Sequence, residues 1–506
     1  MAGSGAVSTK RRRLAQEIAR AGQRETPYGP VIKTLEFGDL VVPYMCPFAL
    51  LWSFCDASPS YASFLSEHLP AGGQPCRIAL YVDEVCPGNA LRPDHARAFY
   101  SFFWLLLDFP DWFRSSAAGW YDICVIKQSD VNKVEGGVSA ITARILSTFW
   151  SSEEWNFERL GVRVAGPRGT LQHVRANFAC FIMDERAEKF VCSVKGSSGS
   201  KLCMSCRNCV GRIDPSLVPE GLQHFSSPGL DGFEPQTYES FCEDFEYLRA
   251  QSGTASQANF AKMQQALGIV FDLAALPYSG ARSIARIPET RFCDWMHNLC
   301  ASGGVAQYQI NQFCIALSAA GISVDQLDIF LGSARTHHAQ TKLKAGFFKD
   351  RTSRADDAHI RAFAGEVLTA MNVLHLFCKM VLEPINALGA HVSLVVIMSE
   401  IFDILCSGDR AAHHVPRLQE LLLRFHRQFL EVSPRCCKPK LHYMHHTPQQ
   451  IGLHRRNLAC FAPERKHQAN KQALNFIYRN MEVALASRNA DEMLRLAQHT
   501  CTFQPA

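Results

Sequence analysis

The sequence contains no uninterrupted run of about 18 apolar residues, the length that a membrane-spanning helix needs. The nearest approach is residues 387–406, where His391, Glu400 and Asp403 interrupt the apolar residues. The N-terminal residues also lack the apolar stretch of a secretion signal. We therefore expect a protein that neither enters a membrane nor is secreted.

Cysteine is present, but not in the pattern of a disulfide-bonded protein. The 20 cysteines are spread over 506 residues, and several of them, such as Cys180, Cys314 and Cys378, lie inside apolar runs. Cysteine in such runs behaves as a small hydrophobic residue. Disulfide frameworks are typical of short secreted chains, so we expect a reducing compartment.

No sign of charge dominates, and the sequence has no internal repeat and no low-complexity tract. The net charge of +5 is mildly basic, which permits contact with a polyanion without indicating one. Hydrophobic residues make up 47% of the chain and charged residues 20%, as in an ordinary globular protein. A chain of this length is expected to form two or three structural units.

A basic cluster lies near the N-terminus, at residues 10–13 (Lys-Arg-Arg-Arg). Such a cluster can act as a nuclear import signal, contact phosphates, or form a solvated basic tail. The sequence leaves these alternatives open. We expect a nuclear protein if the cluster is an import signal, and a cytoplasmic one otherwise.

Apolar runs between residues 75 and 184 predict strands, two of which end in acids. The predicted strands span residues 75–84, 99–107, 121–127, 161–164 and 170–183, and a helix is predicted at 138–150. The first strand ends at Asp83 and Glu84, and the last one at Asp184. A strand tip is a rigid support that is open to substrate. Upstream, residues 40–70 predict an apolar helix followed by a short amphipathic one.

Helical periodicity dominates the second half of the chain. Amphipathic helices are predicted at residues 241–251 and 258–267, followed by an almost wholly helical block at 294–431. The clearest helices in that block span residues 305–319, 359–382, 392–405 and 417–431. Two more are predicted, one from residue 461 toward 479 and one at 490–498.

Two cysteines and two histidines have the types and local spacings of a tetrahedral zinc site. Cys203-x-x-Cys206 follows a Gly/Ser turn, and His442-x-x-x-His446 places two imidazoles one helical turn apart. Cys206-x-x-Cys209 is an equally good register, and His445 can replace either histidine. We expect a structural Zn²⁺ rather than a catalytic one.

Five motifs occur in a recognisable order: Tyr81-Val-Asp-Glu-x-x-x-Gly-Asn-x-Leu91, Asp184 with the cysteine pair, Asp294-Trp-Met-His297, Lys438-Pro-Lys-Leu-His442-x-x-x-His446, and Phe461-x-Pro-Glu464-Arg-x-His467. Together they resemble the DDE transposases of the CACTA (En/Spm-like) group, and their relatives among hAT transposases and the antigen-receptor recombinase. The resemblance covers about residues 75–480. It implies an α/β fold in which an RNase H-like mixed sheet is interrupted by a large all-α insertion.

The resemblance also implies a domain organisation. Residues 1–74 would form a basic tail and helical segment, 75–210 the first part of the RNase H-like core, 211–437 the helical insertion, and 438–506 the completion of the core. In an RNase H-like sheet the strands that end at Asp83 and Asp184 are neighbours, so these acids could share a metal ion.

The implied catalytic triad is Asp83, Asp184 and Glu464, which would bind two Mg²⁺ (or Mn²⁺) ions for phosphodiester displacement. Three other acids compete for these roles: Glu84 at the first site, Glu185 at the second and Glu400 at the third. Asp294 and His297 match a further motif of the family. Their spacing of three residues suits either a local hydrogen bond or cap, or a role near the active site.

DNA is the expected partner, and the resemblance suggests a homodimer. The basic residues proposed to contact phosphates are Arg207, Lys438, Lys440, Arg465, Lys466 and Lys471. The sequence shows no helix-turn-helix or zinc finger that would bind a terminal repeat. Two other functions therefore stay open: a catalytically silent transposase-derived binding module, and a metal-dependent nuclease without strand transfer.

Overall fold

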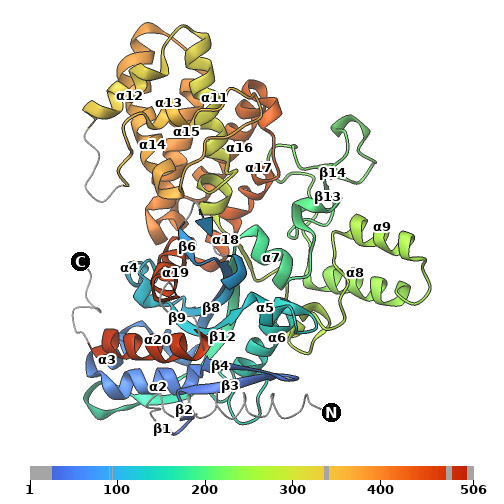
Figure 1. Cartoon of the computed structure of the whole chain (residues 1–506), viewed down its shortest axis with the longest axis vertical. Coiled ribbons are helices and arrows are strands. Elements are labelled where there is room, and N and C mark those ends of the chain that lie inside the picture. Colours follow the sequence, from blue (N-terminus) through green and yellow to red (C-terminus); the bar gives the residue numbers. More distant parts are fainter. Residues whose placement is uncertain (1–24, 90–91, 94, 335–340, 475–480, 499–506) are drawn as a thin grey trace.

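A mixed sheet of five strands forms the centre of the lower part of the molecule in Figure 1. The computed structural model describes residues 25–89, 92–93, 95–334, 341–474 and 481–498, so the basic cluster at residues 10–13 lies outside the described residues. The sheet has the order β15-β12-β5-β8-β9. Its strands are β5 (Cys76–Val85), β8 (Phe99–Leu106), β9 (Tyr121–Lys127), β12 (Ala176–Met183) and β15 (Arg291–Cys293).

The strand directions divide the sheet into two parts. β5, β8 and β9 form an antiparallel meander. β12 runs parallel to β5, and β15 runs parallel to β12. The carboxyl ends of β5, β12 and β15 therefore lie at the same edge of the sheet.

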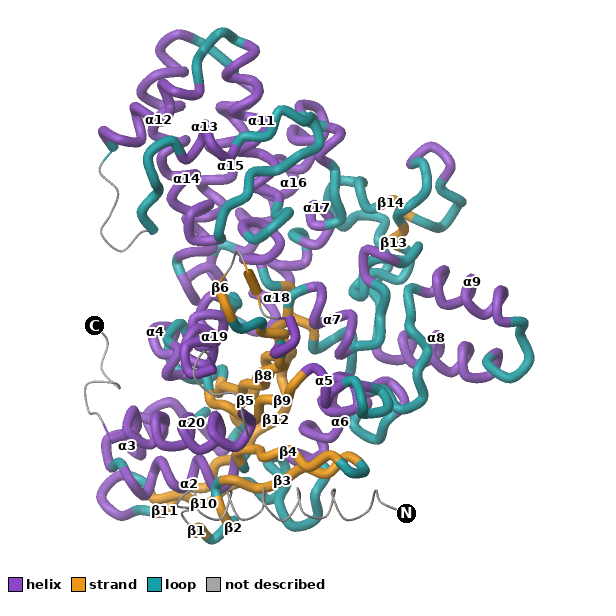
Figure 2. The backbone as a smooth tube through the Cα atoms, viewed as in Figure 1, coloured by secondary structure: helices purple, strands orange, loops and turns teal. Residues whose placement is uncertain are grey.

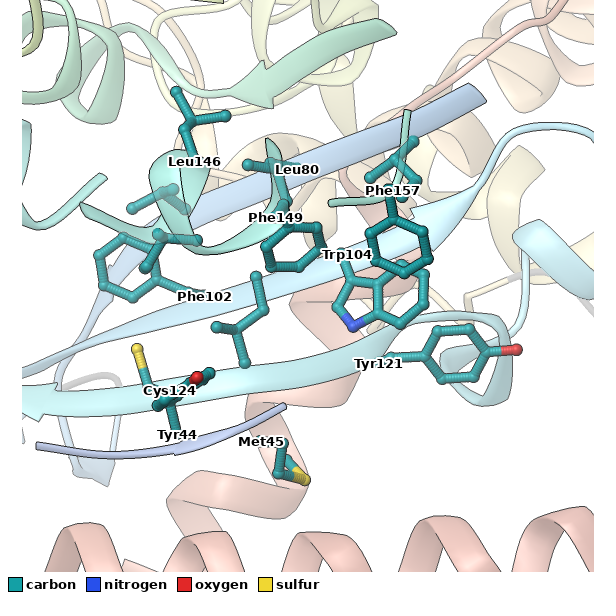
Figure 3. Close-up of a cluster of buried hydrophobic side chains, with 14 of the residues drawn as sticks. Tyr44, Met45, Leu80, Phe102, Trp104, Tyr121, Cys124, Leu146, Phe149 and Phe157 are labelled. Atoms are coloured by element: carbon teal, nitrogen blue, oxygen red, sulfur yellow. The ribbon is translucent and has the colours of Figure 1, made fainter. Parts of the chain in front are cut away.

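Both faces of the sheet are buried, which explains why its strands are almost continuously apolar. In β5, Ile78, Leu80 and Val82 belong to one hydrophobic cluster, whereas Ala79 and Tyr81 belong to another. Figure 3 shows the first cluster, in which Trp104 of β8 lies against both Phe149 and Tyr121 of β9. That side is covered by α2 (Pro47–Ala57), α3 (Pro59–His68), α6 (Gly137–Trp150) and α20 (Met481–Gln498).

The second cluster joins the other face of the sheet to a helical body, the upper part of Figures 1 and 2. This body contains α11 (Val305–Ala319), α12 (Val324–Ser333), α13 (Phe347–Arg351), α14 (Ala364–Phe377), α15 (Gly389–Cys406) and α16 (Val415–Val432). The helices predicted at residues 305–319, 392–405 and 417–431 are confirmed. The helix predicted at 359–382 begins later, at Ala364, and continues beyond Phe377 as a π-helical turn.

Two stretches of the helical body are long and apolar enough to cross a membrane, by length and composition. They are Ala364–Ile385 and Gly389–Cys406. A pair of helical segments that is bent where they join, Met296–Ala319 and Val324–Ser333, is also long and apolar enough when taken together. In each of the two single stretches, 56% of the most apolar window is buried inside the protein. The expectation that the protein stays out of membranes remains a prediction.

The prediction of a helix beginning at residue 40 is wrong. β3 (Ile32–Phe37) and β4 (Leu40–Met45) form an antiparallel hairpin, and the helix α2 begins only at Pro47. Val41 and Val42 favour a strand, and Pro43 is incompatible with a helix interior. Gly38 has φ of 57°, which suits the tight turn of the hairpin.

The strand predicted at residues 170–183 is two strands. β11 (Leu171–Val174) pairs with β10 (Val162–Ala165) in a separate hairpin, and only β12 joins the main sheet. The strand β15 was not predicted, because three residues are too few for a periodic pattern. It lies within residues 211–437, the range that the sequence assigned to the helical insertion.

The segment between β12 and β15 projects at the right of Figure 1. It contains α7 (Glu185–Val191), β13 (Cys209–Val210), β14 (Gln223–His224), α8 (Tyr238–Gln251) and α9 (Gln257–Leu267). After the helical body the chain returns to the sheet through α17 (Lys440–Tyr443), α18 (His446–His454) and α19 (Phe461–Leu474). Three short helices are α4 (Asp111–Arg114), α5 (Gln128–Val131) and α10 (Arg282–Ala285). Two short strand pairs are β1 (Glu25–Thr26) with β2 (Gly29–Pro30), and β6 (Gly88–Asn89) with β7 (Arg92–Pro93).

Candidate active site and metal centre

Three acids lie at the shared carboxyl edge of β5, β12 and β15. Asp83 is near the end of β5, Asp184 follows β12 directly, and Asp294 follows β15 directly. The register aligns Ile182 with Tyr81, and Met183 with Cys293. The three acids therefore lie on neighbouring strands, at similar heights along the sheet.

Asp83 points to the face of the sheet that meets the helical body. It shares this face with Ala79 and Tyr81, because side chains alternate along a strand. The Tyr81 hydroxyl donates a hydrogen bond to Asp83 Oδ2 (3.1 Å), and the Glu84 amide donates one to Oδ1 (2.7 Å). Burial, together with the nearby charges of Asp184 and Glu464, raises the pKa of Asp83 to about 8, against a lowering effect of His297.

Glu84 and Glu185, the alternatives to Asp83 and Asp184, both bond to other side chains. Glu84 lies on the opposite face of β5, where it accepts from Tyr100 and Gln128 (both 3.3 Å) and pairs with Arg186 (3.0 Å). Glu185 accepts from the Ser197 amide (3.0 Å) and pairs with Lys189. These contacts favour Asp83 and Asp184 for the site.

Asp184 and Glu464 are each held at the start of a helix. Asp184 caps α7, with its Oδ1 accepting from the Ala187 amide (2.6 Å). Glu464 lies in the first turn of α19, and its side chain is 40% exposed. The third competitor, Glu400, forms an ion pair with Arg417 (2.7 Å) between α15 and α16 of the helical body.

His297 connects Asp294 to Glu464. Its Nδ1 lies 2.5 Å from Asp294 Oδ2, and its Nε2 lies 3.1 Å from Glu464 Oε1. Burial by itself lowers the pKa of His297, but the two carboxylates raise that pKa well above its usual value. Asp294 Oδ1 also accepts from the Cys460 amide (3.1 Å), which attaches the start of α19 to the end of β15. The Asp294–His297 pair therefore makes a local hydrogen bond and also lies next to the third acid.

The acids surround a common region without closing into a single-ion site. Among the described residues, two groups of three or more metal-ligating side chains have atoms all within 4.8 Å of one another, and Asp83, Asp184 and Glu464 are not one of them. Asp294, His297 and Cys460 form one of these groups. Two contacts of α19 nevertheless bring Glu464 to the same region: His297 Nε2 lies 3.1 Å from Glu464 Oε1, and His467 Nδ1, three residues after Glu464, lies 3.6 Å from Asp83 Oδ2.

The second group is the predicted cysteine–histidine set, Cys203, Cys206, His442 and His446. All four side chains are buried. His446 Nε2 lies 3.3 Å from Cys203 Sγ, 3.4 Å from Cys206 Sγ and 3.3 Å from His442 Nε2. One imidazole nitrogen cannot form three hydrogen bonds, so a cation between these atoms accounts for the arrangement better.

The distances between these four side chains fit a tetrahedral zinc ion. Zn–S bonds of about 2.3 Å and Zn–N bonds of about 2.0 Å separate two nitrogens by about 3.3 Å, and a nitrogen from a sulfur by about 3.5 Å. The alternative ligands are placed differently. His445 Nε2 lies 2.8 Å from His426 Nδ1, and Cys209 is buried nearby but outside the group of four.

A buried ion pair supports the cysteine loop. Arg291 of β15 lies 2.5 Å from Glu188 of α7, and both side chains are less than one-tenth exposed. Arg291 also donates to Ser205 Oγ (3.1 Å), between the two cysteines. The pair therefore joins the sheet edge, the helix that Asp184 caps, and the metal centre.

Glu188→Gln should lower the free energy of unfolding by about 3–5 kcal/mol, because it leaves the buried Arg291 charge without its partner. Chemical denaturation monitored by circular dichroism would measure this loss. Glu243→Gln is the matched control, since Glu243 is 71% exposed and lies 4.0 Å from Arg207. Equal stabilities of the two variants would contradict the prediction.

The structure gives two of the predicted DNA-contacting lysines partners inside the protein. Lys466 pairs with the buried Asp122 (2.8 Å) and is only 12% exposed. Lys440 donates to two backbone carbonyls. Arg465 donates to the Ser115 carbonyl but is exposed, as is Arg207, and Lys438 and Lys471 are half-buried. DNA contact stays a prediction for these last four residues.

A cavity of about 600 Å³ lies beside α19. Phe461, Ala462 and Arg465 of α19 line it, together with Trp295 and residues of α14 and α15. Glu464 and His467 lie on a different face of the same helix. Helix α19 therefore separates this cavity from the side that faces the acids.

The sequence did not reveal that Asp294 follows a strand of the main sheet. The only local signal is the short apolar pair Phe292–Cys293 before the acid, which is too short to distinguish a strand from a helix. Gln450 was also not predicted. Its side chain accepts from the Cys293 amide (2.6 Å) and donates to the Arg291 carbonyl (2.8 Å), so it covers the free edge of β15.

No protein-family model matches the chain, and no curated protein matches its sequence significantly.

Proposed function

We propose that this protein is a metal-dependent DNA-cleaving and strand-joining enzyme of the DDE transposase type. Asp83, Asp184 and Glu464 are its proposed catalytic acids. The observation that carries the proposal is that β5 and β12 are neighbours, which puts Asp83 and Asp184 side by side, while α19, with Glu464, contacts Asp83 through His467. Asp83 and Glu464 are 381 residues apart in the sequence. The motif order of the sequence supports the same reading.

The architecture supports an RNase H-like core. The neighbouring strands β5 and β12 bring Asp83 and Asp184 together, as such a sheet requires. The meander β5–β8–β9, followed by two parallel strands, also agrees with this fold. The helical body lies between β15 and α19 in the sequence, so the third acid reaches the sheet only after it.

The donor set suits Mg²⁺ or Mn²⁺, since both prefer carboxylate oxygens. When bound, two such ions supply an activated water or 3′-hydroxyl and stabilise the departing oxygen of a phosphodiester. Asp83, Asp184 and Glu464 would hold these ions.

His297 and Asp294 have a positioning role in this proposal. Asp294 fixes the orientation of the imidazole through Nδ1, and Nε2 faces Glu464. His297 thereby holds the Glu464 side chain and keeps a proton next to the site. In the metal centre, Cys203, Cys206, His442 and His446 would hold a structural Zn²⁺ that ties the returning chain to the cysteine loop.

The proposal is tested with purified protein, supercoiled plasmid and Mg²⁺ or Mn²⁺. We expect nicked and linear DNA from the wild type, and none from Asp184→Ala. An oligonucleotide with a free 3′-hydroxyl, added to the same reaction, distinguishes strand transfer from simple nuclease activity. DNA binding without cleavage would favour a catalytically silent binding module instead.

Metal binding should release a proton, because the pKa of Asp83 is raised to about 8 in the metal-free site. Below pH 8 the metal must displace this proton, so the dissociation constant for Mg²⁺ should fall about tenfold per pH unit from pH 6 to 8, then level off. Without metal, the free energy of unfolding should fall as the pH rises from the pKa of Asp83 in the unfolded chain toward 8, because the folded site disfavours the ionised carboxylate.

Calorimetric titration with Mg²⁺ in buffers of different ionisation enthalpy measures the proton release. Asp83→Asn, which carries no titratable proton at this position, is the control and should abolish the pH dependence along with most of the affinity. An Mg²⁺ affinity of the wild type that is constant between pH 6 and 8 would contradict the prediction.

A further inference from the structure

The helices that carry the two histidine ligands also contact the active site directly. Lys440 begins α17, two residues before His442. Its Nζ donates to the carbonyl oxygens of His297 and Ser302, both at 2.9 Å. A single side chain thus connects the segment of the metal centre with the segment that contains His297.

The two carbonyls belong to the short helix that follows Asp294 and to the turn after it. That helix is a π-helical turn, Met296–Cys300, which ends at Ala301. Carbonyls at the C-terminal end of a helix lack partners within the helix and carry its partial negative charge. The half-buried ammonium group of Lys440 gives these carbonyls a hydrogen-bond donor and a positive charge.

Helices α17 and α18 also bond to the segment that precedes Asp294 and to the cysteine loop. Gln450 of α18 bonds the backbone of Arg291 and Cys293, just before the acid. Tyr443 of α17 donates to the Leu202 carbonyl (2.9 Å), next to Cys203. Residues 291–302 are therefore attached at both ends to α17 and α18, which also hold the cysteine loop.

This segment sets the position of the third acid. Asp294 accepts from the Cys460 amide before α19, and His297 Nε2 contacts Glu464. A displacement of the His297 backbone would change both contacts. The acidic surroundings of Lys440 include Asp184, Glu185 and Asp294, so its charge lies within the electrostatic reach of the active site.

We propose that Lys440 is a positioning residue that transmits the geometry of the cysteine–histidine metal centre to His297, and through His297 to Glu464. This role differs from direct DNA contact. The expected effect of Lys440 on cleavage rests on the proposed function, whereas its expected effect on the backbone of residues 294–304 does not. Lys440 is thus the link by which a structural metal ion controls the third catalytic acid.

The first test is hydrogen exchange measured by mass spectrometry on the zinc-loaded full chain. In Lys440→Met, amides in residues 294–304 should exchange about tenfold faster than in the wild type, because two carbonyls lose a charged donor. Lys440→Arg should restore most of the protection. Exchange in residues 203–209 and the zinc content should remain as in the wild type.

Lys379→Met is the matched control, because Lys379 is a half-exposed lysine paired with Glu383 in the helical body. It should leave exchange in residues 294–304 unchanged. Removal of zinc from the wild type with a chelator should accelerate exchange in this same segment. Unchanged exchange in Lys440→Met, or in the zinc-free wild type, would overturn the proposal.

The second test separates positioning from DNA contact. Lys440→Met should lower the cleavage rate at saturating DNA at least tenfold and leave the DNA dissociation constant within twofold of the wild type. A contact to phosphate would instead weaken binding and reduce the salt dependence by about one ion. That result, with unchanged exchange in residues 294–304, would replace the proposal by direct contact. If the wild type does not cleave DNA, the exchange experiment still decides the coupling.

Discussion

Glu464→Gln should lower metal-dependent DNA cleavage by at least about a thousandfold, a loss typical when an essential catalytic group is removed. The amide keeps the shape of the side chain but loses the charge that binds a hard cation. Asp83→Asn and Asp184→Asn should have effects of the same size. A double variant should be little worse than either single one, since acids that hold the same ions act as a unit.

The matched control for Glu464→Gln is Glu400→Gln. Glu400 also lies on a helix and is 40% exposed, but it pairs with Arg417 in the helical body. Its variant should keep wild-type cleavage. All the variants should melt within a few degrees of the wild type in the absence of metal. Asp83→Asn should be mildly stabilising at neutral pH, because it removes a half-buried carboxyl with a raised pKa. Robust cleavage by Glu464→Gln, or its loss in Glu400→Gln, would show that the third acid is misassigned.

Cys203→Ser should remove the one zinc ion that we expect per chain and lower the melting temperature by more than about 10 °C, since binding energy at a structural zinc site is also folding energy. The effect should be large here because the site joins segments that are 240 residues apart, Cys206 and His446. Metal analysis and thermal unfolding would measure it. His446→Gln should behave like Cys203→Ser.

Cys209→Ser and His445→Gln test the alternative ligand registers. Both side chains are buried close to the site, so these variants control for the disturbance that any substitution causes there. They should retain one zinc per chain. Zinc loss in Cys209→Ser together with zinc retention in Cys203→Ser would establish the other cysteine register.

The strands that carry two of the acids could be predicted because their apolar runs are long and end abruptly in charge. β5 and β12 are each at least eight residues long, and both are buried. The long helices were predictable for the same reason, since their apolar residues recur over several turns. Helix α16, for example, begins and ends within two residues of the predicted range.

Short or ambiguous segments required the tertiary structure. In residues 40–45, Pro43 argues against a helix, but the strand takes its place only by pairing with β3. β15 exists because β12 offers a free edge on one side and Gln450 covers the other. A three-residue strand has no periodicity of its own, so the place of Asp294 beside Asp184 could not be predicted.

By itself the sequence determined which residue types are available for chemistry: the acids at strand ends, the cysteine and histidine pairs, and the order of the motifs. Only the tertiary structure shows that Asp83 points to the face that meets the helical body and Glu84 to the opposite one. It also groups Cys203 rather than Cys209 with Cys206, and bonds Lys440 to two backbone carbonyls. The physical reason is that these choices depend on direction and distance between segments hundreds of residues apart. Local sequence specifies the face of a strand or helix, but the packing of the helical body on the sheet specifies what that face meets.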